Sequence, residues 1–226
     1  MPLRAAIFDM DGTLVDSERV IMHAWLAATS ELGLPLIPKD YMRVVGLNVE
    51  ESDKILAALL GDPGTLGEVR RSVRERLTGS VAYPLKPGAI ELLTVLRKQG
   101  IPCAVASSSS AREIEERLTR AGVLHFFETI AGGDEVDRGK PDPAVYQLAA
   151  ARLGVSPVHC LAFEDSPHGA ASASAAGATV VFVPDLREAT PELARSVSLV
   201  LGSLADAVPR ISGWFGSCSD SEPPVP

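Results

Sequence analysis

Two carboxylates stand one residue apart near the start of the chain, in the stretch FDMDGTLVDSE. Asp9 and Asp11 follow the apolar run RAAIF, and Gly12 comes directly after them. Because residues i and i+2 of a strand share one face, both carboxylates address the same site at the carboxyl end of the predicted strand. Open α/β sheets bind ligands at that end. Read alone, DMDG is equally compatible with a polar turn that closes a strand.

A second pair of acids, Glu164 and Asp165, follows the apolar run HCLAF. A capped strand-to-helix turn is the alternative for this segment by itself. Parallel strands bring their carboxyl ends to one edge, so the four carboxylates can meet, where each pair 4 Å apart repels by roughly 4 kcal/mol at an effective dielectric near 20. A hard divalent cation relieves this repulsion. The sequence therefore predicts a Mg²⁺ site formed by Asp9, Asp11, Glu164 and Asp165.

Two other predicted strand ends carry groups that suit a phosphate. The run IPCAVA is followed by four serines, and Ser107 and Ser108 offer hydroxyl and backbone N–H donors where a helix begins and its dipole favours an anion. A serine cap on that helix is expected too and does not exclude phosphate binding. Lys140, in GKPDP, is one of few cations near the predicted edge, although a lone lysine is usually a solvated surface charge.

The elements that must position these residues alternate along the chain. Short apolar runs, typical of parallel strands buried on both faces, cover residues 4–8, 101–106, 128–131, 159–163 and 179–183. Helical patterns cover residues 88–100, 111–122, 141–154 and 167–178. This order predicts a doubly wound, three-layer α/β/α fold with a parallel sheet.

Residues 17–81 break this alternation, because helical patterns follow one another there without a strand-like run. We expect an all-helical cap domain over the active end of a core formed by residues 1–16 and 82–212. Residues 213–226 combine Ser, Gly and Pro without periodicity, which predicts a disordered tail.

Composition limits the partners. With 226 residues, 46% of them hydrophobic, the chain can bury a sizeable core. A net charge of -8 argues against binding to nucleic acid, which demands a basic face. Three dispersed cysteines indicate neither a disulfide framework nor a zinc site. We expect neither a secretory leader nor a membrane span, because only residues 1–4 precede the first apolar run and no apolar run approaches membrane length. We expect a cytoplasmic protein, monomeric or weakly dimeric, that does not bind membranes.

Together these residues resemble the four motifs of the haloacid dehalogenase superfamily, specifically its phosphatase branch with a helical (C1-type) cap. The first motif, DxDGT, stands as DMDGT at 9–13, and the serine of the second motif is Ser107. The third motif's lysine matches Lys140, and the acidic fourth motif is EDS at 164–166. The segments FDMDGTLVDSE, GKPDP and FEDSPHG most resemble those of β-phosphoglucomutase and related small sugar-phosphate phosphatases.

The resemblance implies a Mg²⁺-dependent phosphatase that acts on a small phosphorylated metabolite, such as a sugar phosphate. It implies that Asp9 attacks phosphorus and forms an aspartyl phosphate. Asp11 then protonates the leaving alkoxide and later deprotonates the hydrolytic water. Ser107 and Lys140 hold the phosphoryl oxygens and neutralise charge in the transition state.

The resemblance also implies how the metal and the cap take part. The metal contacts the Asp9 carboxylate, the Asp11 backbone carbonyl and Asp165, with Glu164 as a direct or water-mediated ligand. Cap closure excludes bulk water and selects the substrate. Substrate specificity is expected to reside around the cap residues Gly46, Leu47 and Asn48.

Two other functions are alternatives. A β-phosphoglucomutase-like mutase would carry a cap histidine where this chain has Ile21 and a cap arginine where it has Val49, so both departures favour hydrolysis. His23 or an arginine from a shifted register keeps the mutase open; the arginines concerned are Arg43, Arg70, Arg71 and Arg74. Apart from that role, the pattern of Arg70, Arg71 and Arg74 indicates a solvated helix face. A non-catalytic sensor of a phosphorylated metabolite is disfavoured, because every predicted catalytic group is present.

Overall fold

The computed structural model describes residues 2–34, 36–45, 49–77 and 83–216. Six strands form one parallel sheet in the order β3-β2-β1-β4-β5-β6. The strands are β1 (Ala5–Phe8), β2 (Cys103–Ala106), β3 (Thr129–Ala131), β4 (Cys160–Glu164), β5 (Thr179–Phe182) and β6 (Leu199–Val200). The first strand lies between β2 and β4, at the point where the strand order reverses, so its carboxyl end faces the ligand-binding crevice of this topology.

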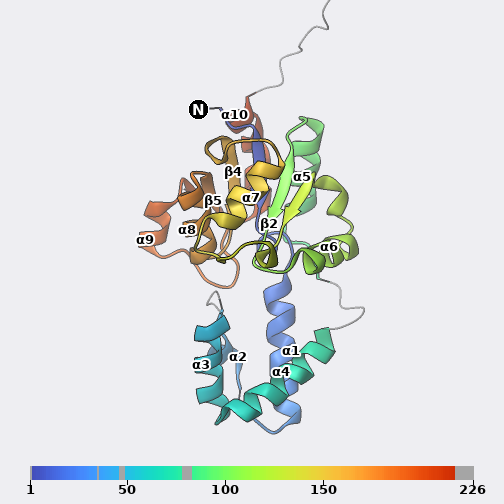
Figure 1. The fold of residues 1–226 in the computed structure, drawn as a ribbon, viewed down its shortest axis with the longest axis vertical. Helices are drawn as coiled ribbons and strands as arrows, with labels where there is room; N and C mark the ends of the chain where they lie inside the picture. The colour runs from blue at the N-terminus through green and yellow to red at the C-terminus, as the bar shows by residue number, and fades with distance from the viewer. Residues whose placement is uncertain (1, 35, 46–48, 78–82, 217–226) are drawn as a thin grey trace, which may run out of the picture.

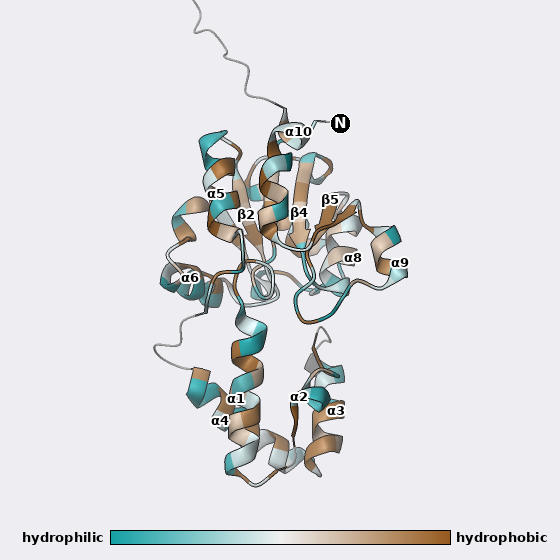
Figure 2. Ribbon diagram, turned by 180° about the vertical axis from the view of Figure 1, so that it is seen from behind, coloured by the Kyte–Doolittle hydropathy of each residue, from teal (hydrophilic) through white to brown (hydrophobic). Residues whose placement is uncertain are grey.

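Helices cover both faces of this sheet, because alternate strand residues are apolar on both sides. Phe8 packs on one face with Leu92 and Ile114, whereas Ile7 packs on the other face with Val145. The core helices are α5 (Ala89–Lys98), α6 (Ala111–Arg120), α7 (Ala144–Arg152), α8 (Pro167–Ala176), α9 (Pro191–Ser196) and α10 (Ile211–Phe215). Short 3-10 helices are η1 (Leu124–Phe126), η2 (Gly133–Glu135), η3 (Pro157–His159) and η4 (Leu204–Arg210). The apolar strands stand out at the centre of the core in Figure 2, and the predicted α/β/α fold is confirmed.

A helical insert follows β1 and extends away from the core as a separate arm (Figure 1). Its helices are α1 (Ser17–Glu31), α2 (Pro38–Tyr41), α3 (Val49–Leu60) and α4 (Pro63–Leu77). The insert has its own apolar cluster, in which Trp25 and Ala28 of α1 pack with Leu56 of α3 and Val69 of α4. The predicted helical insertion is therefore confirmed, while its assignment as an independent domain with the stated boundaries stays a prediction.

The two connections between the insert and the core lie side by side. Val15 forms an antiparallel bridge with Leu85, and the backbone N–H of Asp16 donates to the Pro84 carbonyl at 2.8 Å. The buried carboxylate of Asp185, in the loop after β5, accepts hydrogen bonds at Oδ1 from two donors, Arg19 of α1 and Lys86 beyond the second connection. This ion cluster joins the loop after β5 to the base of the insert.

The end of the chain differs from the expected tail. Helix α10 includes residues 213–215, and its Trp214 packs edge-on against Phe163, with ring centroids 6.2 Å apart. The apolar side chains of this segment explain the difference, because they cover one end of the core cluster. The rest of the expected tail, residues 217–226, lies outside the described residues. Among the residues that are described, no helix is long and apolar enough to cross a membrane.

Candidate active site

The carboxyl end of β1 places Asp9 in the middle of the sheet edge. The backbone N–H of Asp9 donates to the Phe163 carbonyl at 3.0 Å and so extends the pairing with β4 by one residue. The Asp9 side chain is buried, and this burial raises its pKa to about 8; Lys140 partly offsets the rise, and the charge of Glu164 adds to it. A buried carboxyl group at a strand end needs a partner cation.

Lys140 supplies that cation. Its Nζ donates to Asp9 Oδ1 and to Glu164 Oε1, both at 2.6 Å, and to the Ala106 carbonyl at 3.1 Å. Only 5% of the side chain is exposed, so the alternative of a solvated surface lysine is wrong. Burial alone would lower the pKa of Lys140, but the two carboxylates outweigh it and raise the pKa above its ordinary value.

Glu164 is fully buried at the end of β4, and both of its carboxylate oxygens have donors. Oε1 accepts from Lys140 and from the Tyr146 hydroxyl at 2.8 Å. Oε2 accepts from the backbone N–H groups of Asp165 and Ser166 and from the Ser166 hydroxyl, each at 3.2 Å. A carboxylate has about four lone-pair sites. Direct metal ligation by Glu164 would therefore replace one of these bonds, and in this arrangement Glu164 orients Lys140.

Asp165 lies against the turn that follows β1. Its Oδ1 accepts from the Thr13 hydroxyl at 3.1 Å. Gly12 has a left-handed φ of 85°, and a Cβ atom there would lie 2.2 Å from Asp165 Oδ2. Burial raises the pKa of Asp165 well above its ordinary value, and the charges of Asp9 and Glu164 raise it further. The glycine and threonine of DMDGT are thus explained by the close approach of this carboxylate.

The side chain of Asp11 points to different partners from those of Asp9. Asp11 Oδ2 accepts from the Ser109 hydroxyl at 2.9 Å, and Oδ1 accepts from Arg117 Nη1 at 2.6 Å. The oxygens of Asp9, Glu164 and Asp165 come within 4.8 Å of one another, a group to which the Asp11 carboxylate does not belong. Four side-chain carboxylates were expected to come together. Three of them do, and the fourth, that of Asp11, is held by Arg117 instead.

The serines after β2 divide the expected tasks among themselves. Ser107 is buried and accepts from the Ser109 backbone N–H at 3.1 Å, and Ser108 is exposed. Ser110 caps α6 in a capping box with Glu113, which confirms the expected serine cap.

One cavity of about 470 Å³, here called the active-site cavity, is lined by most of the predicted site residues, namely Asp9, Asp11, Ser107, Ser108, Lys140 and Asp165, whereas the buried Glu164 does not line it. Its insert wall includes Ile21 and Val45, and its opposite wall includes Leu186 and Arg187 from the loop after β5. Arg187 Nη2 donates to the Met42 carbonyl at 2.6 Å, so core and insert touch at the mouth. The predicted specificity residues Gly46, Leu47 and Asn48 lie outside the described residues.

Several residues of this site were missed at the level of the sequence. Tyr146 supports Glu164, Arg117 holds Asp11 together with Ser109 of the predicted serine run, and Glu18 lines the cavity from the first turn of α1. Burial raises the pKa of Glu18 to about 7, with smaller contributions from the charges of Asp11 and Asp185. Ser109 had a signal, since it belongs to the serine run, but Arg117 resembles any other charge of an amphipathic helix.

The donor set fits a hard divalent cation. Asp9, Glu164 and Asp165 offer carboxylate oxygens only, which suits ions such as Mg²⁺. Burial and mutual repulsion raise the pKa values of Asp9 and Asp165, which indicates more negative charge than Lys140 balances. The acidic cluster is therefore consistent with a metal site.

Comparisons with known proteins agree with this arrangement. The family model described as haloacid dehalogenase-like hydrolase matches residues 3–177. The chain is 34% identical over 177 residues to the phosphorylated carbohydrates phosphatase of Thermotoga maritima, and this alignment covers 77% of this chain and 82% of the relative. It is 35% identical over 205 residues to hexitol phosphatase A of Escherichia coli, covering 90% of this chain and 93% of the relative.

A solved structure gives the same answer for the fold. A Thermotoga maritima protein assigned as a β-phosphoglucomutase superposes with a TM-score of 0.78 at 28% identity, over 93% of this chain and 99% of that one. The resemblance drawn from the four motifs is confirmed. The chain belongs to the haloacid dehalogenase-like hydrolase family, in its branch of β-phosphoglucomutase-like proteins and sugar-phosphate phosphatases, and is a phosphatase of that superfamily.

Proposed function

We propose that this chain hydrolyses a small phosphorylated metabolite, such as a sugar phosphate, in a Mg²⁺-dependent reaction through an aspartyl phosphate on Asp9. The observation that carries the proposal is the buried Asp9 carboxylate, held by Lys140 at 2.6 Å beside Glu164 and Asp165 at the sheet edge. A fixed, desolvated carboxylate next to a cation is suited to attack a phosphate group in line.

The reaction needs two steps, and each has a candidate group. In the first, an Asp9 oxygen bonds to phosphorus, the bond to the leaving oxygen breaks, and Asp11 gives that oxygen a proton. In the second, Asp11 takes a proton from water, the water oxygen bonds to phosphorus, and the bond to Asp9 breaks. Lys140 and the donors of Ser107 and Ser108 would hold the phosphoryl oxygens, because these residues line the same cavity.

Asp9 and Asp165 would hold Mg²⁺ with the Asp11 backbone carbonyl, and Glu164 would act directly or through water. When bound, the ion supplies positive charge between the carboxylates and the substrate phosphate. Lys140 alone does not balance the three clustered carboxylates, of which Asp9 and Asp165 line the cavity that would hold the anionic substrate, so turnover should depend on the metal.

Ile21 favours hydrolysis over transfer of the phosphoryl group to a second hydroxyl. This side chain lines the active-site cavity where a mutase carries a histidine, and it offers neither acid nor base to steer a sugar hydroxyl. The relatives support the substrate class, since one is named for phosphorylated carbohydrates and another for hexitol.

Release of phosphate from p-nitrophenyl phosphate, with Mg²⁺ and with EDTA, tests the activity, and Asp9→Asn is the control. We expect Mg²⁺-dependent turnover in the wild type and none in the variant. A panel of sugar and hexitol phosphates, including glucose 1-phosphate with its bisphosphate activator, then tests the substrate class. No turnover of any compound would contradict the enzyme, and isomerisation without net phosphate release would contradict hydrolysis.

A further inference from the structure

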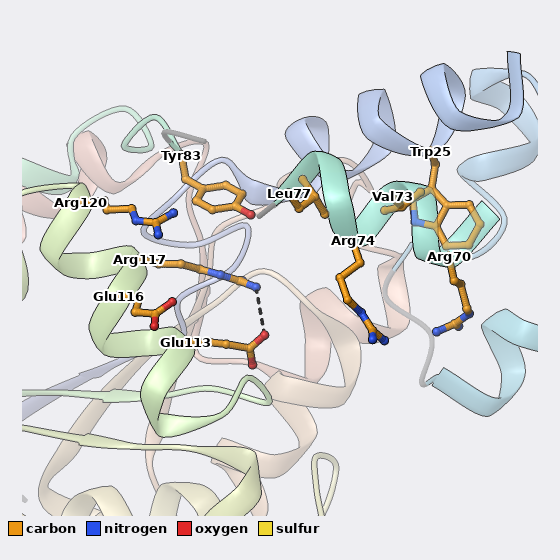
Figure 3. A pocket seen from close by; sticks show the side chains of 10 residues that line it. All are labelled: Trp25, Arg70, Val73, Arg74, Leu77, Tyr83, Glu113, Glu116, Arg117 and Arg120. Atoms are coloured by element: carbon orange, nitrogen blue, oxygen red, sulfur yellow. Dashed lines mark ion pairs between the residues drawn. The ribbon is translucent and has the colours of Figure 1, made fainter. Parts of the chain in front are cut away.

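A second cavity, of about 400 Å³, lies between helix α4 of the insert and helix α6 of the core (Figure 3). We call it the arginine cleft. Its charged lining residues are Arg70, Arg74, Arg117, Arg120, Glu113 and Glu116. The helical pattern of α4 predicted a solvated face for its arginines; Arg71 and Arg74 are exposed, Arg70 is partly exposed, and Arg70 and Arg74 line this cleft opposite the side chains of α6.

The charge of the cleft is opposite to that of the chain. Four guanidinium groups line it against two carboxylates, whereas the whole chain has a formal net charge of -8. Glu116 accepts from Arg112 at 3.0 Å, and Glu113 accepts from Ser110 in the capping box and pairs with Arg117 at 3.8 Å (Figure 3). Beyond the lining residues, Arg117 also pairs with Asp11 and Arg70 pairs with Asp53. Clustered guanidinium groups bind phosphate and carboxylate oxygens through charge-assisted hydrogen bonds. The cleft therefore suits an anionic group.

Two buried aromatic rings form the walls behind these charges. The Arg70 guanidinium lies over the Trp25 ring, 6.0 Å from its centroid, and the Arg117 guanidinium lies over the Tyr83 ring at 5.2 Å. Stacking orients the two guanidinium groups, each of which also donates to a carboxylate, Arg70 to Asp53 and Arg117 to Asp11. A cavity of this size accommodates a small molecule.

Arg117 connects the cleft to the active site. It lines both cavities, and its Nη1 donates to Asp11 Oδ1 at 2.6 Å. Asp11 faces the leaving group in the proposed reaction, so the part of a substrate beyond the broken bond lies on the side of Arg117. An anion that binds Arg117 also competes with Asp11 for this guanidinium group.

We propose that the arginine cleft binds a phosphate or carboxylate group, and that Arg117 couples its occupancy to Asp11. The group can belong to the substrate, as a second anionic group on the leaving part, or to a separate small anion. The coupling rests on the proposed function, whereas binding in the cleft does not.

Binding is tested with sulfate as the probe. In a Trp214→Phe background, Trp25 is the single tryptophan and reports on the cleft. At constant ionic strength kept with chloride, we expect a saturable change in Trp25 fluorescence. Combining Arg74→Gln with Arg120→Gln should weaken the apparent Kd by about tenfold or more. Arg71→Gln is the matched control, because Arg71 is an exposed residue of α4 that does not line the cleft.

Two results would overturn binding: no saturable change in folded wild-type protein, or equal weakening by Arg71→Gln and by the double variant. Circular dichroism establishes that each variant is folded. This measurement needs no turnover, so it stands even where p-nitrophenyl phosphate is not hydrolysed and the proposed function fails.

Inhibition of p-nitrophenyl phosphate hydrolysis then separates the two sources of the anion. If the group belongs to the substrate, the double variant raises the inhibition constant of fructose 1,6-bisphosphate about tenfold and leaves that of fructose 6-phosphate unchanged. If it is a separate anion, sulfate changes kcat in the wild type and not in the double variant. The bisphosphate result assigns the anionic group to the substrate, and the sulfate result supports the coupling to Asp11. If neither changes, the coupling through Arg117 is wrong.

Discussion

The core and the insert bury polar groups in different ways. In the core, buried polar side chains gather around the active site, where Asp9, Ser107 and Glu164 have hydrogen-bond partners among their neighbours. The cluster inside the insert is apolar, and its buried Thr29 bonds to its own helix through the Trp25 carbonyl. The ion pair between Arg70 and Asp53 within the insert is partly exposed.

This difference determines which residues tolerate substitution. A buried carboxylate is stable only while its donors remain, so each residue of the core site depends on the others. An apolar cluster tolerates substitutions of similar volume, and surface charges tolerate most changes. The insert is therefore free to change the residues that face the substrate while the core keeps the same chemistry.

The largest effect is expected for Lys140→Met, which leaves Asp9 and Glu164 without their shared cation. We expect kcat to fall about 1,000-fold, as for loss of a donor to the transition state. The free energy of unfolding without metal should fall by about 3–5 kcal/mol at pH 8, because a buried ion cluster loses its cation. Urea unfolding measures it.

The matched variant is Lys39→Met, at an exposed lysine of the insert helix α2. It should keep its activity and change stability by less than about 1 kcal/mol. The loss of stability in Lys140→Met should also be smaller at pH 5, because the carboxyl groups left without a cation bind protons there. Equal stability of the two variants would contradict the contrast between core and insert.

The next effect is expected for Gly12→Ala. Gly12 has a φ of 85°, and an added Cβ would lie 2.2 Å from Asp165 Oδ2, so this carboxylate must move. We expect the Mg²⁺ concentration for half-maximal activity to rise about 10- to 100-fold, as when a ligand is mispositioned. Titration of activity with Mg²⁺ measures it.

Gly33→Ala in the insert separates strain from contact. Gly33 has a φ of 68°, and among the described residues, its chain neighbours apart, no atom lies within 4 Å of an added Cβ. Both alanine variants should lose about 1 kcal/mol of stability from the left-handed backbone. Only Gly12→Ala should change the Mg²⁺ dependence. An equal change of the Mg²⁺ dependence in both variants would show that the contact of the added Cβ with Asp165 is not its cause.

The same contrast explains what could be predicted from the sequence. The sheet and the positions of Asp9, Lys140 and Asp165 follow from apolar runs and from the shared edge of parallel strands. These features are local patterns joined by one rule of topology. Helix α2 and strand β6, with 4 and 2 residues, are too short for such patterns and were missed.

Contacts between distant side chains were not predictable. Arg117 lies 106 residues from Asp11, and nothing in the pattern of α6 distinguishes it from its charged neighbours. Arg74 of α4 was interpreted as solvated and is exposed, but helical periodicity, which separates polar from apolar faces, does not show that this polar face borders a cavity. Periodicity therefore finds the core of the insert but not the cavity beside it.

A moderate effect is expected at the junction of the two regions, where burial raises the pKa of Glu18 to about 7 from 4.5. Between these values the folded protein keeps a proton that the unfolded chain has lost, so this group lowers stability as pH rises from about 4.5 to about 7. Glu18→Gln removes the penalty. We expect the variant to exceed the wild type by about 1 kcal/mol at pH 8, a value reduced for partial solvent screening.

Urea unfolding of both proteins at pH 4.5, 6 and 8 measures this difference. It should be near zero at the lowest pH, grow with pH, and level off above the pKa of about 7. A difference that is constant over this range would show that the carboxyl group of Glu18 titrates alike in the folded and unfolded chains.

The smallest effects are expected for exposed ion pairs. They test whether the greater sensitivity of the core site comes from burial or from its location in the core. Lys54 pairs with Glu50 in the insert at 2.7 Å, and Arg195 pairs with Glu192 in the core at 3.2 Å; all four side chains are at least 71% exposed. Because water screens both pairs, Lys54→Gln and Arg195→Gln should each cost about 0.5 kcal/mol or less and leave kcat within about twofold. Thermal unfolding at low and high salt measures both. A clearly larger loss for the core pair than for the insert pair would mean that the core is sensitive as a region, whereas equal small losses assign the contrast to burial.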